Sequence, residues 1–325
     1  MTTLVTGAAG FIGFHVARRL LDRGERVIGL DSLNSYYAPQ LKRDRLAELA
    51  HPAFTFHEVN LADAAALRAA LAGERPRRII HLAAQAGVRH SMDNPQAYVE
   101  SNLVGQVNLL EYARHLGGLE SLVYASSSSV YGGNTRLPFS ESDPVDNPVS
   151  LYAATKKSDE LMGNVYAHLF RIPMTGLRFF TVYGPWGRPD MALWVFTEAI
   201  LEGRPLPVFN HGDMSRDFTY VDDVVAGVLA AADTPPRDDG QAPPHRIYNI
   251  GNNRPEPLMR LIDTLEQAIG RTAQRELLPM QPGDVASTYA DITAIRRDLG
   301  WEPTTPIEVG VPRFVDWFRR YHGLA

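Results

Sequence analysis

The sequence predicts an α/β fold, with a doubly wound parallel sheet and a smaller mixed α/β lobe. Two patterns predict it. Up to residue 180, short apolar and β-branched runs alternate with helix-like segments, which is typical of a parallel sheet covered by helices on both faces. Beyond that point the elements are shorter and are broken by Gly and Pro. We therefore expect a Rossmann-type nucleotide-binding domain over residues 1–180 and a substrate-binding lobe over residues 181–325, with some segments crossing between the two.

The expected elements alternate regularly along the first domain. Strands are expected at 3–6, 27–30, 54–59, 78–82, 121–125 and 175–179, and helices at 14–23, 64–71, 96–116 and 151–169. In the second lobe we expect helices at 193–201, 222–232, 257–269 and 306–321, and an exposed loop at 234–244. Ligands of such sheets lie beyond the carboxyl ends of the strands, so the polar residues that follow each strand are candidate site residues.

A glycine-rich turn joins the first expected strand to the first expected helix. Gly7, Gly10 and Gly13 let the backbone turn tightly and approach a pyrophosphate, which the helix N-terminus attracts through its N–H groups and dipole. The next strand ends in Asp31, whose carboxylate would accept hydrogen bonds from a ribose and repel a 2′-phosphate. The order of strand, turn, helix and acid predicts a dinucleotide site and favours NAD over NADP.

Tyr152 and Lys156 lie four residues apart, on one face of an expected helix. A phenol ordinarily titrates near ~10, but a neighbouring cation favours the phenolate, which can take a proton from a sugar or alcohol hydroxyl. The alternative interpretation of this spacing is a solvated helix face. The dinucleotide motif in the same chain favours the catalytic interpretation.

The composition excludes several kinds of site and partner. The chain of 325 residues has no Cys, which excludes disulfides, thiolate zinc sites and cysteine nucleophiles. Its net charge is −5 and it has no basic run, so neither nucleic acid nor a membrane is an expected partner. The 10 His are scattered, and we predict no metal. An expected strand at Thr3 and the shortness of the apolar runs predict a cytoplasmic enzyme.

A set of motifs spans essentially the whole chain. They are Thr6-Gly-Ala-Ala-Gly-Phe-Ile-Gly13, Asp31, Leu82-Ala-Ala-Gln85, Asn102, the Ser run before Val130-Tyr-Gly132, Tyr152-x-x-x-Lys156 and Arg178-Phe-Phe-Thr-Val-Tyr-Gly184. Together they resemble the extended short-chain dehydrogenase/reductase family, whose members act on nucleotide sugars with a tightly held NAD. The resemblance implies catalytic roles for Tyr152, Lys156 and Ser127. It implies NAD contacts at Gly7, Gly10, Phe11, Ile12, Gly13, Asp31, Asn34, Asn60, Leu61, Leu82, Ala83, Ala84, Asn102, Tyr152, Lys156 and Phe179.

The resemblance also implies a set of substrate contacts. They are Gln85, Ser127, Ser128, Ser129, Thr181, Arg188, Ala192, Leu193, Val208, Phe209, Arg216 and Asp284. Two positions depart from the pattern of the family. Asn60 stands where many relatives carry Asp, a change that keeps an acceptor and adds donors. Gln281 stands where relatives acting on neutral sugars often place Arg on the diphosphate, so we expect Arg216 to carry more of that charge.

The serine run from 127 to 129 bears on the type of sugar. Relatives that eliminate water carry Asp and Glu at the last two positions, and decarboxylating relatives carry Glu at the last one. Hydroxyls cannot supply that acid–base chemistry, but they can donate hydrogen bonds to an anionic group. Thr181 stands where UDP-galactose 4-epimerases usually show Asn, and it adds one more hydroxyl donor. Arg188 adds a guanidinium group that can form two parallel hydrogen bonds to a carboxylate. Alternatively, the last two serines cap the next turn, and Arg188 forms a structural pair with Asp190.

Within the family, the nearest resemblance is to the UDP-glucuronate 4-epimerases. It rests on Asp31-Ser-Leu-Asn-Ser-Tyr-Tyr37, Ala84-Gln-Ala-Gly-Val-Arg-His90, Gly184-Pro-Trp-Gly-Arg-Pro-Asp190 and Gln281-Pro-Gly-Asp284. The resemblance implies C4 epimerisation of a UDP-sugar, UDP-glucuronate, to UDP-galacturonate through a 4-keto intermediate, in a homodimer paired through 96–116 and 151–169. Three alternatives stay open: a neutral UDP-hexose 4-epimerase acting on UDP-glucose or UDP-N-acetylglucosamine, a UDP-glucuronate decarboxylase, and a non-catalytic NAD-sensing protein.

Overall fold

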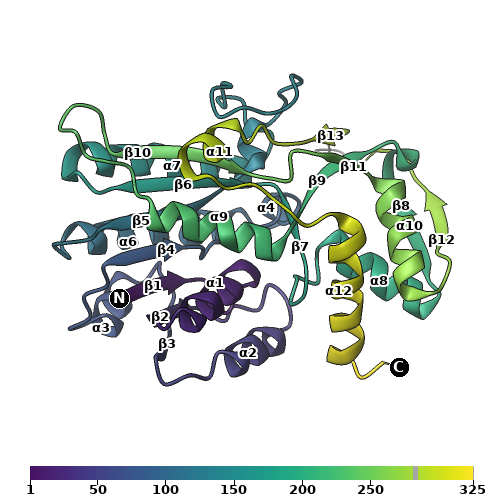
Figure 1. The fold of residues 1–325 in the computed structure, drawn as a ribbon, viewed down its shortest axis with the longest axis horizontal. Helices are drawn as coiled ribbons and strands as arrows, with labels where there is room; N and C mark the ends of the chain where they lie inside the picture. The colour runs from purple at the N-terminus through teal and green to yellow at the C-terminus, as the bar shows by residue number, and fades with distance from the viewer. Residues whose placement is uncertain (281–284, 325) are drawn as a thin grey trace.

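The computed structural model describes residues 1–280 and 285–324, and within them the main layer is a seven-stranded sheet (Figure 1). The strand order is β10-β6-β5-β4-β1-β2-β3, and every pairing is parallel. The strands are β1 (Thr2–Thr6), β2 (Arg26–Asp31), β3 (Phe54–Glu58), β4 (Arg78–His81), β5 (Ser121–Ser127), β6 (Met174–Phe179) and β10 (His245–Ile250). The predicted α/β fold with a doubly wound parallel sheet is therefore confirmed.

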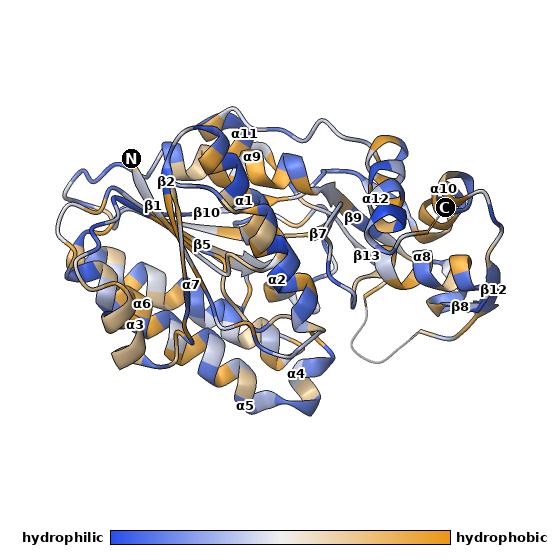
Figure 2. Ribbon diagram, turned by 90° about the horizontal axis from the view of Figure 1, so that it is seen from below, coloured by the Kyte–Doolittle hydropathy of each residue, from blue (hydrophilic) through white to orange (hydrophobic). Residues whose placement is uncertain are grey.

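Helices cover both faces of this sheet (Figure 2). One face carries α1 (Phe11–Asp22), α9 (Val221–Asp233) and α11 (Thr293–Leu299), and the other carries α3 (Ala64–Ala70), α6 (Gly105–Arg114) and α7 (Leu151–Phe170). Successive strand side chains point to opposite faces, so Val5 packs in the hydrophobic cluster of Phe14 from α1 while Leu4 packs in that of Leu110 from α6. The two apolar layers fix the sheet between its helices.

A smaller lobe follows the first six strands and lies at the right of Figure 1. It contains a sheet of β7 (Thr181–Tyr183), β9 (Ser215–Tyr220), β11 (Pro255–Pro257) and β13 (Ser287–Thr288), and a pair formed by β8 (Pro205–Val208) and β12 (Gln274–Leu277). Helices α8 (Ala192–Glu202), α10 (Leu258–Ile269) and α12 (Ile307–Tyr321) pack together beside them. Because α9 and β10 return to the large sheet, the chain crosses between the two parts after residue 180.

Several segments differ from the predicted elements. The strand β10, the helix α11 and the strands of the smaller lobe were not predicted. The predicted helix at 96–116 is divided into α5 (Pro95–Tyr98), π-helical turns at Val99–Val104, and α6. Apolar spacing does not reveal the extra residue in each π turn, and such turns often occur at functional sites. The helix α2 (Pro39–Glu48) was not predicted, because its buried face carries Lys42 and Arg45 in place of an apolar stripe.

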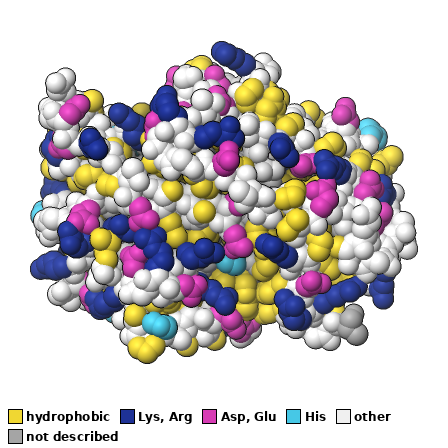
Figure 3. Space-filling view, in the orientation of Figure 1, with side chains coloured by type: hydrophobic (Ala, Val, Ile, Leu, Met, Phe, Trp, Pro, Cys, Tyr) yellow, Lys and Arg dark blue, Asp and Glu magenta, His cyan; other side chains and the backbone are white. Residues whose placement is uncertain are grey.

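Short turns of helix complete the fold. They are α4 (His90–Asp93) and the 3₁₀ turns at Ser128–Tyr131 and Phe209–Gly212. Acidic and basic side chains are interspersed over the face drawn in Figure 3, in keeping with 37 acidic and 32 basic residues in the chain. Within residues 1–280 and 285–324, no helix combines the length and apolar character needed to cross a membrane.

Candidate active site

The carboxyl ends of the large sheet open into a cavity of about 500 Å³. It lies where the predicted site was expected, beyond the ends of β1 to β6, and the smaller lobe also lines it. The predicted residues on its walls are Gly7, Gly10, Phe11, Ile12, Gly13, Asp31, Asn34, Asn60, Leu61, Leu82, Ala83, Ala84, Gln85, Ser127, Ser128, Ser129, Tyr152, Lys156, Phe179, Thr181, Arg188 and Arg216. Residues far apart in the sequence therefore share one cavity.

The glycine turn forms a cradle that has no room for side chains. A Cβ atom on Gly13 would lie 2.0 Å from the carbonyl oxygen of Gly7, and a Cβ on Gly7, whose φ is +71°, would lie 2.7 Å from the amide nitrogen of Ala83. Gly10 precedes α1 and offers no side-chain cap, so the first N–H groups of the helix are available to a pyrophosphate. This cradle fits the diphosphate of a dinucleotide.

Asp31 ends β2 beside the cradle. Its Oδ2 accepts a hydrogen bond from the Ala9 amide at 3.2 Å, and its Oδ1 accepts one from the Leu33 amide at 2.9 Å. The Lys42 ammonium lies 3.8 Å from Asp31 Oδ1 and donates to Asn34 Oδ1 at 2.8 Å. Burial lowers the pKa of Lys42. The fixed carboxylate fits an adenosine ribose.

Lys42 also lines the cavity, and the sequence reasoning missed it. Without α2 in the predicted elements, nothing placed this side chain next to Asp31. Pro39 in the first turn of α2 was the available signal, because Pro is favoured at the start of a helix.

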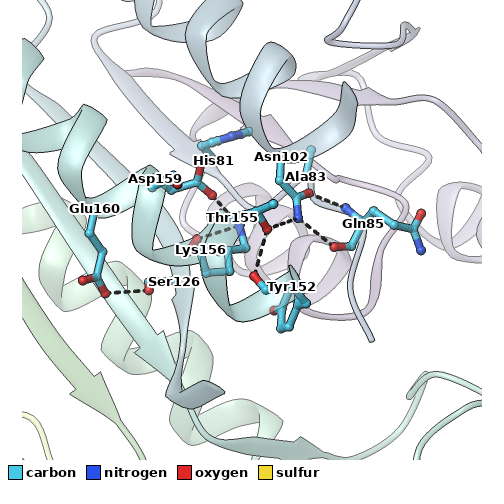
Figure 4. A network of polar contacts seen from close by, with 12 residues as sticks. His81, Ala83, Gln85, Asn102, Ser126, Tyr152, Thr155, Lys156, Asp159 and Glu160 are labelled. Carbon is cyan, nitrogen blue, oxygen red and sulfur yellow. Dashed lines mark hydrogen bonds and ion pairs between the residues drawn. The ribbon is translucent and has the colours of Figure 1, made fainter. Parts of the chain in front are cut away.

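Tyr152 and Lys156 line the cavity from the first turns of α7. Ser150 caps this helix, its Oγ accepting a hydrogen bond from the Ala153 amide at 3.1 Å. The Lys156 ammonium donates to the Ala125 carbonyl oxygen at 3.0 Å and to Asp159 Oδ2 at 2.9 Å (Figure 4). These contacts hold the lysine of α7 against the end of β5, and Ser127 belongs to that same strand.

Asn102, from the π-helical turns, is 2% exposed and does not line the cavity. Its side chain accepts a hydrogen bond from the Gln85 amide at 2.8 Å and donates to the Gln85 carbonyl and to Thr155 Oγ1, each at 3.0 Å (Figure 4). Thr155 in turn donates to the Tyr152 carbonyl oxygen at 2.8 Å. Asn102 therefore ties the loop after β4 to the helix of the catalytic candidates.

Ser127 caps the 3₁₀ turn that follows β5. Its Oγ accepts a hydrogen bond from the Ser129 amide and donates to Ser129 Oγ, both at 3.1 Å. The alternative interpretation gave this capping role to Ser128 and Ser129, and the structure gives it to Ser127. Ser128 and Ser129 line the same cavity as Ser127.

Arg188 lines the cavity and also forms the ion pair that the alternative interpretation proposed. Its Nε and Nη2 atoms lie 2.9 and 2.6 Å from the two oxygens of Asp190, and the Tyr36 hydroxyl donates to Asp190 at 3.0 Å. Burial disfavours the cation, but the Asp190 carboxylate outweighs burial, and the pKa of Arg188 is raised. Arg188 therefore stays charged and is oriented by the Asp190 carboxylate.

The remaining predicted positions lie in the smaller lobe. Arg216 lines the cavity and donates to the carbonyl oxygens of Ser215 and Ala286 at 2.9 and 3.1 Å. Ala192, Leu193, Val208 and Phe209 do not line it. The first two border an adjoining small pocket that shares Thr181 and Arg188 with the cavity. Val208 is fully buried, and the Phe209 ring lies under the Arg89 guanidinium at 5.6 Å. The roles expected for Gln281 and Asp284 concern positions outside the residues that the structure describes.

Comparison with known proteins agrees with this geometry. The model of the NAD dependent epimerase/dehydratase family matches residues 3–251. The chain belongs to this family. Two relatives span nearly its full length: Protein CapI of Staphylococcus aureus, 49% identical with 99% of each chain covered, and a probable UDP-glucuronate 4-epimerase of Rhizobium meliloti, 47% identical with 100% of this chain and 99% of the relative covered.

Solved structures of epimerases have the same fold. UDP-glucuronic acid 4-epimerase from Bacillus cereus, in complex with UDP-glucuronic acid and NAD, superposes with a TM-score of 0.89 at 34% identity, over 99% of this chain and 100% of that one. UDP-glucose 4-epimerase from Thermotoga maritima, with UDP-glucose, gives a TM-score of 0.88 at 31% identity, over the same shares. The two structures carry different sugars, so fold alone does not select between an acidic and a neutral sugar.

Proposed function

We propose that this chain is an isomerase that uses NAD to epimerise UDP-glucuronate to UDP-galacturonate at C4. The observation that carries the proposal is one cavity in which the glycine cradle, Tyr152 with Lys156, and the Arg188 cation meet. A relative at 47% identity is a probable UDP-glucuronate 4-epimerase, and the Bacillus cereus structure holds UDP-glucuronic acid with NAD. The glycine turn would hold the diphosphate of the cofactor, and Asp31 its adenosine ribose.

Tyr152, Ser127 and Lys156 divide the proton chemistry. Bound NAD would supply the hydride chemistry at C4 of the sugar, with removal from one face and return to the other. Tyr152, as a phenolate kept charged by Lys156, takes the proton of the C4 hydroxyl and later returns it, while Ser127 donates a hydrogen bond to the C4 oxygen. Between the two transfers the substrate is a 4-keto sugar, which turns about its link to the diphosphate. The reaction has no net change of redox state.

Arg188 and the hydroxyls of Ser128, Ser129 and Thr181 would hold the carboxylate of the sugar. All four line the cavity, and Arg188 stays charged. The 4-keto intermediate of UDP-glucuronate is a β-keto acid, which loses carbon dioxide when the breaking bond aligns with the carbonyl π system. Donors that fix the carboxylate away from this alignment suppress the loss, and positioning of this kind is within reach of hydroxyls and an arginine.

The test is a product assay on purified protein without added NAD. The protein is incubated separately with UDP-glucuronate, UDP-glucose and UDP-N-acetylglucosamine, and the products are resolved by chromatography and NMR. We expect UDP-galacturonate from the first and little conversion of the others. Conversion of only the neutral sugars would establish the neutral 4-epimerase instead. A pentose product would establish a decarboxylase, and no conversion even with added NAD would favour the NAD-sensing alternative.

We also propose that the enzyme acts as a homodimer. One face of α7 exposes Leu161, Val165 and Leu169 by 56, 49 and 61%, four residues apart, and Val104 and Val107 are exposed before and in α6. A row of exposed apolar side chains on neighbouring helices supports an interface between copies of the chain. Light scattering should give twice the mass of one chain, and the double variant Leu161→Glu with Val165→Glu should give the mass of one chain.

A cytoplasmic location stays a prediction from the sequence.

A further inference from the structure

Two consecutive acids on α7 form buried ion pairs of different kinds. Both carboxylate oxygens of Glu160 have partners. They accept hydrogen bonds from Arg178 at 2.7 and 2.9 Å, and one of them also accepts from the Ser126 hydroxyl at 2.7 Å. Asp159 contacts Lys156 through Oδ2 at 2.9 Å, and its Oδ1 is buried without a hydrogen-bond partner. Figure 4 shows the contact between Asp159 and Lys156. Their side chains are 2 and 3% exposed, so solvent screens their attraction little.

The other titratable groups packed around this pair do not replace either charge. On β4, burial lowers the pKa of His81 to about 3, so this ring is neutral near pH 7 (Figure 4). On β5, burial raises the pKa of Tyr124 well above its ordinary value. On β6, the Arg178 cation is matched by Glu160 of α7 itself. Asp159 is therefore the carboxylate that faces the Lys156 ammonium among the described residues.

We infer that Asp159 is a positioning residue that holds the Lys156 ammonium beneath the active site and offsets part of the charge that Lys156 exerts on Tyr152. The inference deepens the proposed function, because it concerns how the proton acceptor of that reaction is set. An ammonium has three donors. Asp159 and the Ala125 carbonyl oxygen take two of them, which leaves one to be directed at the cofactor or at the phenol.

The sign of the effect follows from electrostatics. A carboxylate next to Lys156 weakens the positive potential at Tyr152, so a given fraction of phenolate is reached at a higher pH than with the lysine alone. Replacing Asp159 by Asn keeps an acceptor oxygen for the ammonium and removes the negative charge. We expect Asp159→Asn to move the acidic limb of the kcat profile to lower pH by roughly 0.5–1 unit, with KM for the sugar nearly unchanged.

The protonation of Asp159 itself predicts a second effect on the pH dependence of kcat. Burial raises its pKa to about 6, and the Lys156 cation opposes this rise. Below about pH 6 the wild-type carboxyl is therefore protonated and no longer offsets the lysine. The wild-type and Asp159→Asn profiles should converge in that range and separate above it.

A spectroscopic titration tests the inference without turnover. The phenolate absorbance of the NAD-bound protein is followed against pH, and subtraction of the Tyr152→Phe titration isolates Tyr152 from the other Tyr among the 13 of the chain. Asp159→Asn and, as a second uncharged variant, Asp159→Ser should shift this component to lower pH. Asp263→Asn, which removes from α10 a carboxylate that pairs with Arg275, is the matched control and should leave it in place.

The outcomes separate this inference from the proposed function. If both uncharged variants bind NAD and titrate like the wild type, Asp159 does not act on Tyr152 and the inference is wrong. If they shift as expected while the wild type converts no UDP-glucuronate, the proposed substrate is wrong and the role of Asp159 stands. A merely structural role would lower stability without moving the titration, and this result also contradicts the inference.

Discussion

The two ends of the cavity that we propose as the active site, one for the cofactor and one for the sugar, are built by different means. At the cofactor end, the approach of Gly13 to the Gly7 carbonyl and of Gly7 to Ala83 is set by backbone, and a Cβ atom would not fit. At the sugar end, the charged group is Arg188, which is oriented by Asp190 and indirectly by the Tyr36 hydroxyl. Substitutions at the cofactor end should create steric clashes that abolish NAD binding almost completely. Substitutions at the sugar end should lower substrate affinity by graded amounts that differ between sugars.

The largest effect is expected from Gly13→Ala at the cofactor end. The new Cβ would lie 2.0 Å from the Gly7 carbonyl oxygen, so the turn must open. We expect NAD binding and all turnover to be lost, and the free energy of unfolding to fall by roughly 1–3 kcal/mol. NAD content and chemical unfolding measure this. Gly133→Ala, whose Cβ would have its nearest neighbour at 3.9 Å, should behave like the wild type. Full NAD binding by Gly13→Ala would contradict the view that close backbone contacts set the cofactor end.

Tyr152→Phe, between the two ends, should lower kcat by roughly 10²–10⁴-fold, because the proton acceptor is removed. NAD content should stay at the wild-type level, since the ring remains in the cavity wall. Tyr166→Phe removes another hydroxyl from α7, one that donates to Glu111, and should leave kcat unchanged. Retained turnover in Tyr152→Phe would mean that another group takes the proton.

Arg188→Ala tests the sugar end. A charge-assisted hydrogen bond contributes about 1.5–3 kcal/mol, so the Kd of UDP-glucuronate should rise by roughly 10–100-fold. The Kd of UDP-glucose should change much less, because it has no carboxylate. Calorimetric titration with both sugars measures the difference, and Arg204→Ala, which removes an exposed arginine of the same lobe, is the control. Equal losses for both sugars would assign Arg188 to structure alone, through its pair with Asp190.

Ser129→Ala should have the smallest effect at the sugar end. One neutral hydrogen bond contributes about 0.5–1.5 kcal/mol, so affinity for UDP-glucuronate should fall by roughly 2–10-fold. A carboxylate held less firmly should also release carbon dioxide in some turnovers, and a pentose product detected by NMR would show it. Ser142→Ala, on an exposed loop, is the matched control. A variant with wild-type affinity and no pentose would remove Ser129 from the carboxylate site.

Local sequence was sufficient for the parts of the molecule that depend on neighbouring residues. The glycine turn, Asp31 at the end of β2, and the four-residue spacing of Tyr152 and Lys156 were all predicted and line one cavity. Each is a short motif whose geometry follows from strand, turn and helix alone. The helix α2 escaped prediction because its buried face carries Lys42 and Arg45, whose partners come from other segments.

The sequence by itself determined the parallel sheet, the glycine turn and the spacing of Tyr152 and Lys156, because period, turn chemistry and helix spacing act over a few residues. Only the tertiary structure decided that the Tyr36 hydroxyl reaches Asp190, and that Lys156 and Asp159 are buried with the second oxygen of Asp159 left unpartnered. It also decided that β10 joins the edge of the large sheet. The physical reason is that burial and the contacts between distant segments depend on how the whole chain packs, which sequence spacing does not specify.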